Sequence, residues 1–347
     1  MSKKKVALLF GGVSSEHDVS CMSVASVYEN IDREKYDPQL LGITKSGEWY
    51  LYSGDIENVR QNKWEEDKKN LKRAFICPDR SVHGMMVEEG PTMFPHRIDV
   101  VFPVLHGRNG EDGSMQGLLE IAGIPYVGCR VLSAALCMDK DVCHAVLKNA
   151  GVPQVKWLTF MRGCDLEHAF HAVSTELGYP VFVKPANAGS SVGITKAKSE
   201  AELGAAFDLA FANDCKIIVE AAVFGNRELS VGGPGEIVPA DEFYSYDAKY
   251  FNAESKLYIP ARLSDEKAAE IREMAKHAYQ VLGCRGLTRV DFLVERETGA
   301  VVLNEPNTLP GFTNISMYPK LMMAAGMSYP DLISGLIELA VSEFSEE

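Results

Sequence analysis

Short apolar blocks alternate with turn-forming and polar residues in the first third of the chain. Three of these blocks have the length of a strand: residues 6–10, 39–43 and 100–103. Gly11 and Gly12 end the first block in a tight turn, and residues 21–28 are predicted to continue as a helix. This alternation predicts a doubly wound α/β sheet, in which ligands bind at the carboxyl ends of the strands.

Two glycine-rich loops offer backbone amides to a ligand. The first, residues 105–113, leaves the third strand and precedes a helix predicted at residues 114–122. The second, residues 189–193, follows an apolar strand, residues 181–185, that contains Lys184. A lysine beside a Gly/Ser loop suits a triphosphate, because the loop binds oxygens while the ammonium group offsets charge. The same composition is also common in ordinary turns, so both interpretations stay open.

A predicted hairpin near the carboxyl end carries the strongest chemical signal. Its apolar runs are residues 288–294 and 300–304, with a turn composition between them. If the hairpin is symmetric about Thr298, side-chain alternation places four polar residues on one face: Arg289, Asp291, Glu305 and Asn307. Carboxylates that face each other across a sheet suit Mg²⁺, which also binds nucleotide phosphates. A solvated face with ordinary surface carboxylates is the alternative.

The segments between these motifs are less informative. Residues 54–95 are polar and irregular, and we predict an insertion there without chemistry. We place a domain boundary near residue 133, where a single helix is predicted to begin, run through residues 138–141 and end at Gly151.

Two later segments each allow two interpretations. Residues 216–219 form an apolar strand before Glu220, which suits either a hinge beside an adenine or a plain core strand. Residues 241–255 are polar and aromatic, which suits either a lid over a site or a surface loop.

Composition places the chain among ordinary cytoplasmic enzymes. A length of 347 residues with 46% hydrophobic residues predicts two or three domains with ample cores. The net charge of −13 argues against nucleic acid as the main partner. No apolar run has the length of a membrane helix, and no signal peptide is expected. The eight cysteines lack a Cys-x-x-Cys pair and are predicted to be reduced thiols.

The order and spacing of the motifs resemble those of the D-alanine-D-alanine ligases, members of the ATP-grasp superfamily, over essentially the whole chain. The matching motifs are residues 11–16, 106–117, 138–140, 184–185, 189–193, 249–250, 289–291 and 304–316. The resemblance implies an α/β fold in which an ATP-grasp fold follows an amino-terminal doubly wound domain. The implied domains are residues 1–133, a central subdomain 134–225, and a carboxyl-terminal subdomain 226–347 with the metal and substrate site.

The resemblance also implies an ATP site with two Mg²⁺ ions, for which Mn²⁺ is a possible substitute. The implied metal ligands are Asp291, Glu305 and Asn307. The implied ATP contacts are Lys140, Lys184 and Lys249 to phosphates, Ser191 in the Gly/Ser loop, Glu220 to adenosine, and Glu228 to ribose.

A second implied set of residues binds the amino acids. In that set Glu16 holds the ammonium group of the first D-alanine and is linked through Ser190 to Tyr250. The implied oxyanion contacts are Arg289 and the backbone of Gly311, and the second subsite is Ser316 with Met317. His106 is expected to line the first-substrate wall, whereas His144 is expected on a helix surface where the common family pattern has lysine.

The implied activity is ATP-dependent joining of two D-alanine molecules through an acyl phosphate, for peptidoglycan precursors, in a homodimer. The alternative is a D-alanine-D-serine ligase of the vancomycin-resistance type, which residues 42–50 and 137–144 resemble. Residues 311–317 resemble the D-alanine enzymes, and the apolar Met317 favours a methyl group over a hydroxymethyl group. A regulator that has lost catalysis and an ATP-grasp ligase with other substrates are further alternatives.

Overall fold

The computed structural model describes most of the chain and divides it into two compact units. The described residues are 3–189, 191–223, 227–231, 234–238, 256–295, 297–313 and 315–346, without the side chains of residues 227–231 and 346. The first unit consists of Met1–Ala135, Gly283–Arg289 and Thr308–Glu347, and the second of Leu136–Leu282 and Val290–Asn307. The domain boundaries expected at residues 133 and 225 stay predictions.

A seven-stranded sheet with the order β6-β5-β4-β3-β2-β1-β7 forms the centre of the first unit. The three predicted strands are confirmed as β1 (Lys4–Gly11), β2 (Tyr36–Ile43) and β7 (Val100–Pro103). β1 pairs in parallel with both β2 and β7, so the carboxyl ends of these three strands meet at one edge of the sheet. The antiparallel strands are β3 (Trp49–Tyr52), β4 (Leu71–Ile76), β5 (Gly84–Glu89) and β6 (Thr92–Arg97).

The prediction of an irregular insertion at residues 54–95 was wrong. This segment contains α2 (Ile56–Arg60), two short 3₁₀ turns, η1 (Trp64–Glu66) and η2 (Lys68–Asn70), and the strands β4, β5 and β6. In β4 the exposed Phe75 separates the buried residues Ala74 and Ile76, and in β5 the half-buried Met86 separates the buried Met85 and Val87. A strand with one solvated face has a polar average composition. The average composition of residues 54–95 therefore did not indicate these strands.

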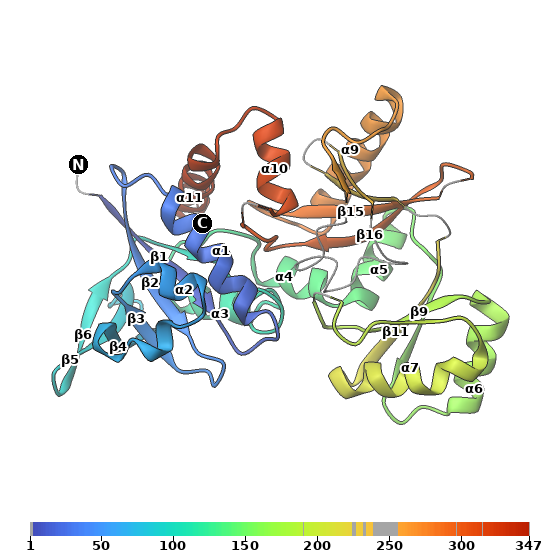
Figure 1. The fold of residues 1–347 in the computed structure, drawn as a ribbon, viewed down its shortest axis with the longest axis horizontal. Coiled ribbons are helices and arrows are strands. Elements are labelled where there is room, and N and C mark those ends of the chain that lie inside the picture. The colour runs from blue at the N-terminus through green and yellow to red at the C-terminus, as the bar shows by residue number, and fades with distance from the viewer. Residues whose placement is uncertain are drawn as a thin grey trace. The chain divides into compact units, whose positions relative to one another are not determined.

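Helices cover both faces of this sheet (Figure 1). Val6, Leu8 and Phe10 of β1 pack into a core with α1 (His17–Asn30) and α11 (Tyr329–Glu346). The alternate residues Ala7 and Leu9 pack into a second core with α3 (Ser114–Ala122). Period-two alternation along one strand therefore builds the doubly wound arrangement, and the predicted helix at residues 114–122 is confirmed.

The single helix predicted through residues 138–141 is two helices. α4 (Val131–Met138) ends before Asp139, and α5 (Lys140–Asn149) begins after it. The Asp139 carboxylate accepts a hydrogen bond from the backbone N–H of Val142 at 3.2 Å, which makes Asp139 the amino-terminal cap of α5. Its two oxygens also lie 2.7 and 2.6 Å from the Lys216 ammonium group. The aspartate starts a new helix instead of extending the old one, because its side chain satisfies a free backbone donor.

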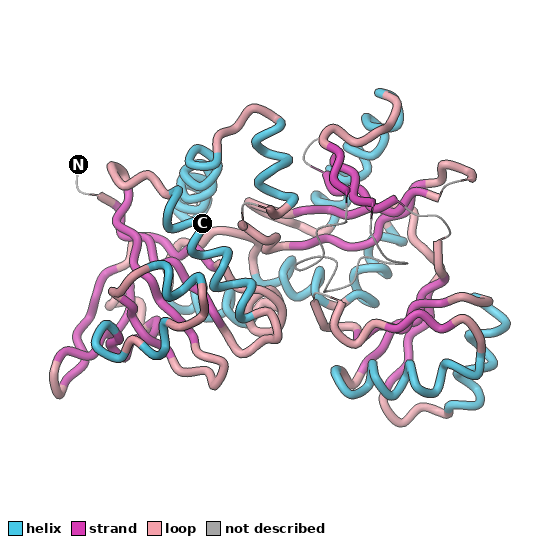
Figure 2. The backbone as a smooth tube through the Cα atoms, in the orientation of Figure 1, coloured by secondary structure: helices cyan, strands magenta, loops and turns pink. Residues whose placement is uncertain are grey.

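Two antiparallel sheets form the second unit (Figure 2). The first has the order β10-β9-β11-β8 and contains β8 (Trp157–Met161), β9 (Val181–Pro185), β10 (Thr195–Ala197) and β11 (Lys216–Ala221). α6 (Leu166–Ala172), a π-helical turn η3 (Val173–Leu177) and α7 (Glu200–Asn213) accompany it. Their apolar residues share one core with the sheet, centred on Phe207 and Val183.

The other sheet has the order β14-β13-β12-β15-β16. Its strands are β12 (Arg227–Val231), β13 (Gly235–Val238), β14 (Lys256–Tyr258), β15 (Arg289–Val294) and β16 (Val301–Asn307), with α9 (Asp265–Val281) against β12. β15 and β16 confirm the predicted hairpin.

In the first unit, α10 (Met317–Ala324) packs on α11. Among the described residues, no helix combines the length and apolar character that crossing a bilayer requires. All eight cysteines lie in the described part of the chain, and none of them forms a disulfide.

Candidate functional site

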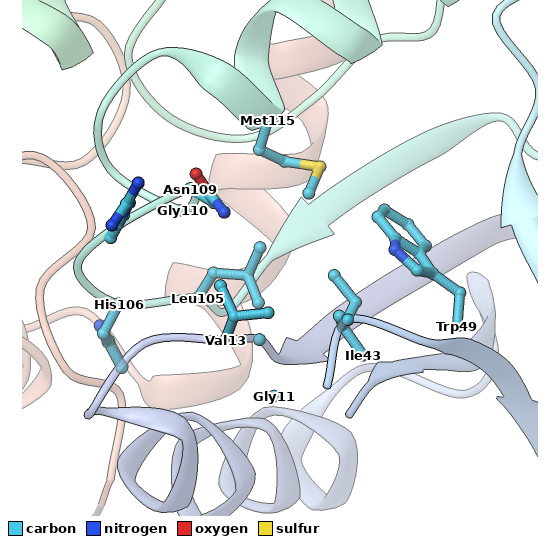
Figure 3. Close-up of a pocket in the computed structure, with 12 residues that line it drawn as sticks. Gly11, Val13, Ile43, Trp49, Leu105, His106, Asn109, Gly110 and Met115 are labelled. Atoms are coloured by element: carbon cyan, nitrogen blue, oxygen red, sulfur yellow. The ribbon is translucent and has the colours of Figure 1, made fainter. Parts of the chain in front are cut away.

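A cavity of about 170 Å³ opens in the first unit where β1, β2 and β7 end (Figure 3). It is lined by Gly11, Gly12, Val13, Ile43, Gly47, Trp49, Leu105, His106, Arg108, Asn109, Gly110 and Met115. The glycine turn after β1 and the glycine-rich loop after β7 supply most of this lining, and the second of them was predicted to offer backbone amides to a ligand. The carboxyl ends of the parallel strands were the place that the doubly wound pattern predicted for a ligand.

His106 lines this cavity, is buried, and has a defined tautomer. Its Nδ1 lies 3.1 Å from the carbonyl oxygen of Leu309, so Nδ1 carries the hydrogen, because a carbonyl only accepts. Nε2 lies 3.4 Å from the Ser23 hydroxyl, which therefore donates to it. Burial, with a smaller contribution from the Arg289 charge, lowers the pKa of His106 despite the neighbouring Glu16 carboxylate. The imidazole is therefore neutral near pH 7 and acts as a fixed hydrogen-bonding group.

Glu16 is buried at the start of α1 and lies against the glycine-rich loop after β7. A methyl group added at Gly107 would lie 2.5 Å from Glu16 Oε2. The backbone N–H of Gly107 donates to Glu111 Oε2 at 2.7 Å, and the other oxygen of Glu111 accepts from Leu309 N at 3.2 Å. Glu111 therefore holds this loop beside the segment that follows β16 along the chain.

The predicted second-substrate residues lie in that same segment of the first unit. A methyl group at Gly311 would lie 2.8 Å from Ser316 Oγ, and the Thr313 and Ser316 hydroxyls are 2.8 Å apart. Met317 is buried as the first residue of α10. The backbone N–H of Phe312 points to Ser23 Oγ at 3.5 Å.

Ser23 and Glu111 were missed by the sequence analysis. Ser23 contacts both His106 and the segment around Phe312, while Glu111 connects two loops. A small polar residue in a helix gives no sequence signal of such a role. Glu111 stood inside a motif of the resemblance, but its partner Leu309 is 198 residues away along the chain.

In the second unit, Lys184 and Glu220 form a buried ion pair. β9 and β11 are antiparallel with Lys184 opposite Ile218, so Glu220, two residues further, shares the face of Lys184. Lys184 Nζ lies 2.6 Å from Glu220 Oε2. Burial acts to raise the pKa of the Glu220 carboxyl, but the Lys184 charge and a hydrogen bond from His144 outweigh it and lower the pKa to about 2. Glu220 is therefore ionised at neutral pH.

The prediction that His144 lies on a helix surface was wrong. Its side chain is 5% exposed, its Nε2 lies 3.1 Å from Glu220 Oε1, and its Nδ1 is hydrogen-bonded to Gln154. The ring stacks on Trp157 with centroids 4.9 Å apart. His144 is three residues before the buried Leu147, so it lies on the inward face of the helix. The helical period gave the signal for this burial.

Lys140 reaches the Gly/Ser loop, while several predicted ATP contacts lie outside the described residues. Lys140 Nζ donates to the carbonyl oxygen of Ala188 at 2.7 Å, just before the loop. Ser191 adopts a left-handed backbone conformation with φ +61°. The predicted contacts Ser190, Lys249 and Tyr250 are not described, and Glu228 is described only as backbone of β12.

The predicted metal ligands lie on the hairpin of β15 and β16. Asp291 is fully buried on β15, and Asn307 Nδ2 donates to its Oδ2 at 2.9 Å. Glu305 is partly buried on β16. Within the described part of the chain, no three His, Cys, Asp or Glu side chains gather as a metal site. The predicted set instead combines the Asp291 and Glu305 carboxylates with the Asn307 amide. Two carboxylates and an amide supply hard oxygen donors, a set that fits Mg²⁺ or Mn²⁺.

The turn of this hairpin differs from the expected symmetric one. Glu295 N donates to Ala300 O at 2.9 Å, and Gly299 N donates to Glu295 O at 3.0 Å. Glu295 thus faces both Gly299 and Ala300, whereas symmetry about Thr298 would place it opposite Val301. Gly299 has φ +69°, the left-handed conformation that allows such a one-residue bulge.

The lowered pKa of Glu220 predicts an acid-sensitive contribution to stability. A carboxyl with a pKa near 4.3 when unfolded and a lower one when folded stabilises the fold above about pH 5. For a folded pKa of about 2, roughly 3 kcal/mol of the free energy of unfolding is lost as the pH falls from about 5 to about 2. Urea unfolding between about pH 6 and pH 2 measures this loss. Glu220→Gln should show a shallower pH dependence, and equal slopes would contradict the prediction.

Two family models match the chain. The model described as "D-ala D-ala ligase N-terminus" matches residues 5–129, and "D-ala D-ala ligase C-terminus" matches residues 146–338. The D-alanine-D-alanine ligase of Thermoanaerobacter sp. (strain X514) is 49% identical over 360 residues, covering 100% of this chain and 99% of the relative. That of Caldicellulosiruptor bescii is 48% identical over 356 residues, covering 99% of this chain and 96% of the relative.

Solved structures of similar proteins include both substrate types considered from the sequence. The VanG D-Ala:D-Ser ligase from Enterococcus faecalis is 43% identical with a TM-score of 0.88, covering 98% of this chain and 100% of that one. The D-alanine-D-alanine ligase from Coxiella burnetii is 32% identical with a TM-score of 0.86, covering 100% of this chain and 96% of that one.

Proposed function

Because this chain belongs to the D-alanine-D-alanine ligase family, we propose that it is an ATP-dependent ligase that joins two D-alanine molecules into D-alanyl-D-alanine for peptidoglycan precursors. The resemblance inferred from the motifs is confirmed at the level of the family, and the α/β fold of the chain agrees with it. The single observation that carries the proposal is identity near one half over almost the full length of relatives with this name.

The proposed reaction has two steps. A carboxylate is a poor electrophile, so the first D-alanine attacks the terminal phosphorus of ATP through its carboxylate and releases ADP. The amine of the second D-alanine then attacks the carbonyl carbon of this acyl phosphate, loses a proton and expels inorganic phosphate. Two bound Mg²⁺ ions would screen the charge of the transferring phosphoryl group. We assign no residue as the base.

The second unit would hold ATP and the metal. In this proposal Lys140, Lys184 and Lys249 bind phosphates beside the loop of Ser191, while Glu220 and Glu228 contact the nucleoside. The metal ligands are Asp291, Glu305 and Asn307. Two features support these roles: the Lys140 ammonium group lies at the Gly/Ser loop, and the Asp291 carboxylate adjoins Asn307.

The first unit would hold the amino acids. Glu16 binds the ammonium group of the first D-alanine and is linked through Ser190 to Tyr250, and His106 forms part of the wall. Arg289 and the backbone N–H of Gly311 receive the negative charge that develops on the acyl oxygen. Support comes from the buried position of Glu16 against the glycine-rich loop and from the Ser316 hydroxyl, which lies where a side chain at Gly311 would begin.

The choice of D-alanine as second substrate rests on Met317. This side chain is apolar and buried, and a hydroxymethyl group beside it would lose hydrogen bonds to water. The named relatives at higher identity favour the same substrate over D-serine, although the VanG structure keeps D-serine as the second candidate. We further propose a cytoplasmic homodimer.

ADP release with magnesium and ATP tests the proposal directly. D-Alanine is offered alone and then against an excess of D-serine, and the dipeptides are identified by mass. We expect D-alanyl-D-alanine to predominate in both mixtures. Predominant D-alanyl-D-serine would move the assignment to the second candidate, and the absence of ADP formation with either amino acid would overturn the ligase assignment.

A further inference from the structure

We propose that His144 is a positioning residue whose imidazolium shares the Glu220 carboxylate with Lys184 and so keeps Lys184 available for nucleotide phosphates. This inference rests on the proposed function, in which Lys184 contacts ATP. Lys184 Nζ lies 2.6 Å from Glu220 Oε2, and His144 Nε2 lies 3.1 Å from Oε1 of the same carboxylate. The buried Glu220 carboxylate thus binds Lys184 through one oxygen and His144 through the other.

The hydrogen bonds around His144 require both ring nitrogens to donate. Gln154 Nε2 donates to the carbonyl oxygen of Pro153 at 2.8 Å, so the amide oxygen of Gln154 is the atom that faces His144 Nδ1. An amide oxygen only accepts, so Nδ1 carries a hydrogen. Nε2 faces the ionised Glu220 carboxylate, which also only accepts. The ring in this arrangement is therefore doubly protonated.

The other groups around the ring agree with a positive charge. Trp157 of β8 stacks on His144 with an interplanar angle of 23°, an arrangement that favours a cation against an aromatic face. The indole N–H of Trp157 donates to Asp141 at 3.1 Å, so a carboxylate lies at the edge of the stacked indole ring. The nearby cations are Lys184 on β9 and Lys148 on α5, whose Nζ lies 5.2 Å from the Trp157 ring centre. Glu220 on β11 offsets the charge directly.

Loss of the proton on His144 would change what Lys184 can do. With Nδ1 still donating to Gln154, the lone pair of Nε2 would face Glu220 Oε1 and repel it. The carboxylate would then be balanced by Lys184 alone, and an ammonium group held more tightly by a buried anion is less able to bind phosphate oxygens. Nucleotide affinity is therefore expected to fall whenever position 144 is neutral.

Two substitutions separate the charge from the shape of the side chain. His144→Gln keeps a hydrogen-bond donor without charge, and His144→Lys keeps a permanent cation. We expect His144→Gln to weaken Mg-ADP binding, measured by calorimetry without turnover, by about tenfold, the size of one lost charge-assisted hydrogen bond. His144→Lys should stay within about twofold of the wild type, and His277→Gln, at an exposed histidine on α9, is the matched control.

Further readouts distinguish positioning from a merely structural role. The KM for ATP should rise in His144→Gln while the KM for D-alanine stays unchanged. Unchanged nucleotide binding by His144→Gln, or an equal loss of nucleotide affinity in His144→Gln and His144→Lys, would overturn the inference while dipeptide synthesis stands. A wild type that binds no nucleotide would overturn the proposed function as well.

Discussion

Replacement of Asp291 by asparagine is expected to reduce the rate of dipeptide formation by about 10³-fold, because it removes one of two carboxylates from the proposed metal ligands. Asp291 is fully buried on β15 and accepts a hydrogen bond from Asn307. Asparagine has nearly the same shape and can accept that hydrogen bond through its amide oxygen. The loss should therefore appear in catalysis and in the magnesium requirement, with little change in the fold.

Initial rates of ADP release across a range of magnesium concentrations measure this effect. The half-saturating magnesium concentration should rise in Asp291→Asn, and excess metal should restore part of the activity. Glu295→Gln is the matched control, because Glu295 is a carboxylate on the same hairpin that lies at its turn. An Asp291→Asn variant with wild-type rates at all magnesium concentrations would remove Asp291 from the metal site.

The elements that could be predicted from the sequence are those whose patterns are local. The strands at residues 6–10 and 181–185 are apolar runs, and the helix at 114–122 follows directly from its periodicity. The break at Asp139 was missed because an aspartate inside a helical pattern and an aspartate that caps a new helix have the same local composition. Which one forms depends on a single hydrogen bond to Val142 and on the Lys216 ion pair.

Polar contacts between distant segments could not be predicted in the same way. The sequence indicated Lys184 and the glycine-rich loops, because a backbone that approaches phosphate needs glycine and a cation. It gave no indication that Glu220 would be shared with His144, since those residues are separated by 76 positions and three strands along the chain. The pairing is decided by the order of strands in the sheet, which no local pattern encodes.

Replacement of Gly107 by alanine is expected to reduce kcat/KM for D-alanine by about 100-fold, the size of effect that follows when a binding group is displaced by about 1 Å. The added methyl group would lie 2.5 Å from Glu16 Oε2. Because that oxygen is the far end of a flexible side chain, the carboxylate moves aside and the protein still folds. The proposed contact with the substrate ammonium group would be lost, whereas the ATP affinity should remain unchanged.

The Gly90→Ala variant separates the effect of the clash with Glu16 from the effect of the backbone strain. Gly90 has φ +65° and Gly107 has φ +68°, so both alanines bear the same left-handed strain of about 1–2 kcal/mol. A methyl group at Gly90 meets no heavy atom within 4 Å, so Gly90→Ala should lose stability without losing activity. Thermal unfolding and D-alanine kinetics of both variants give the comparison. Equal activity in the two would mean that the Glu16 carboxylate does not bind the substrate, because the strain alone would then explain both variants.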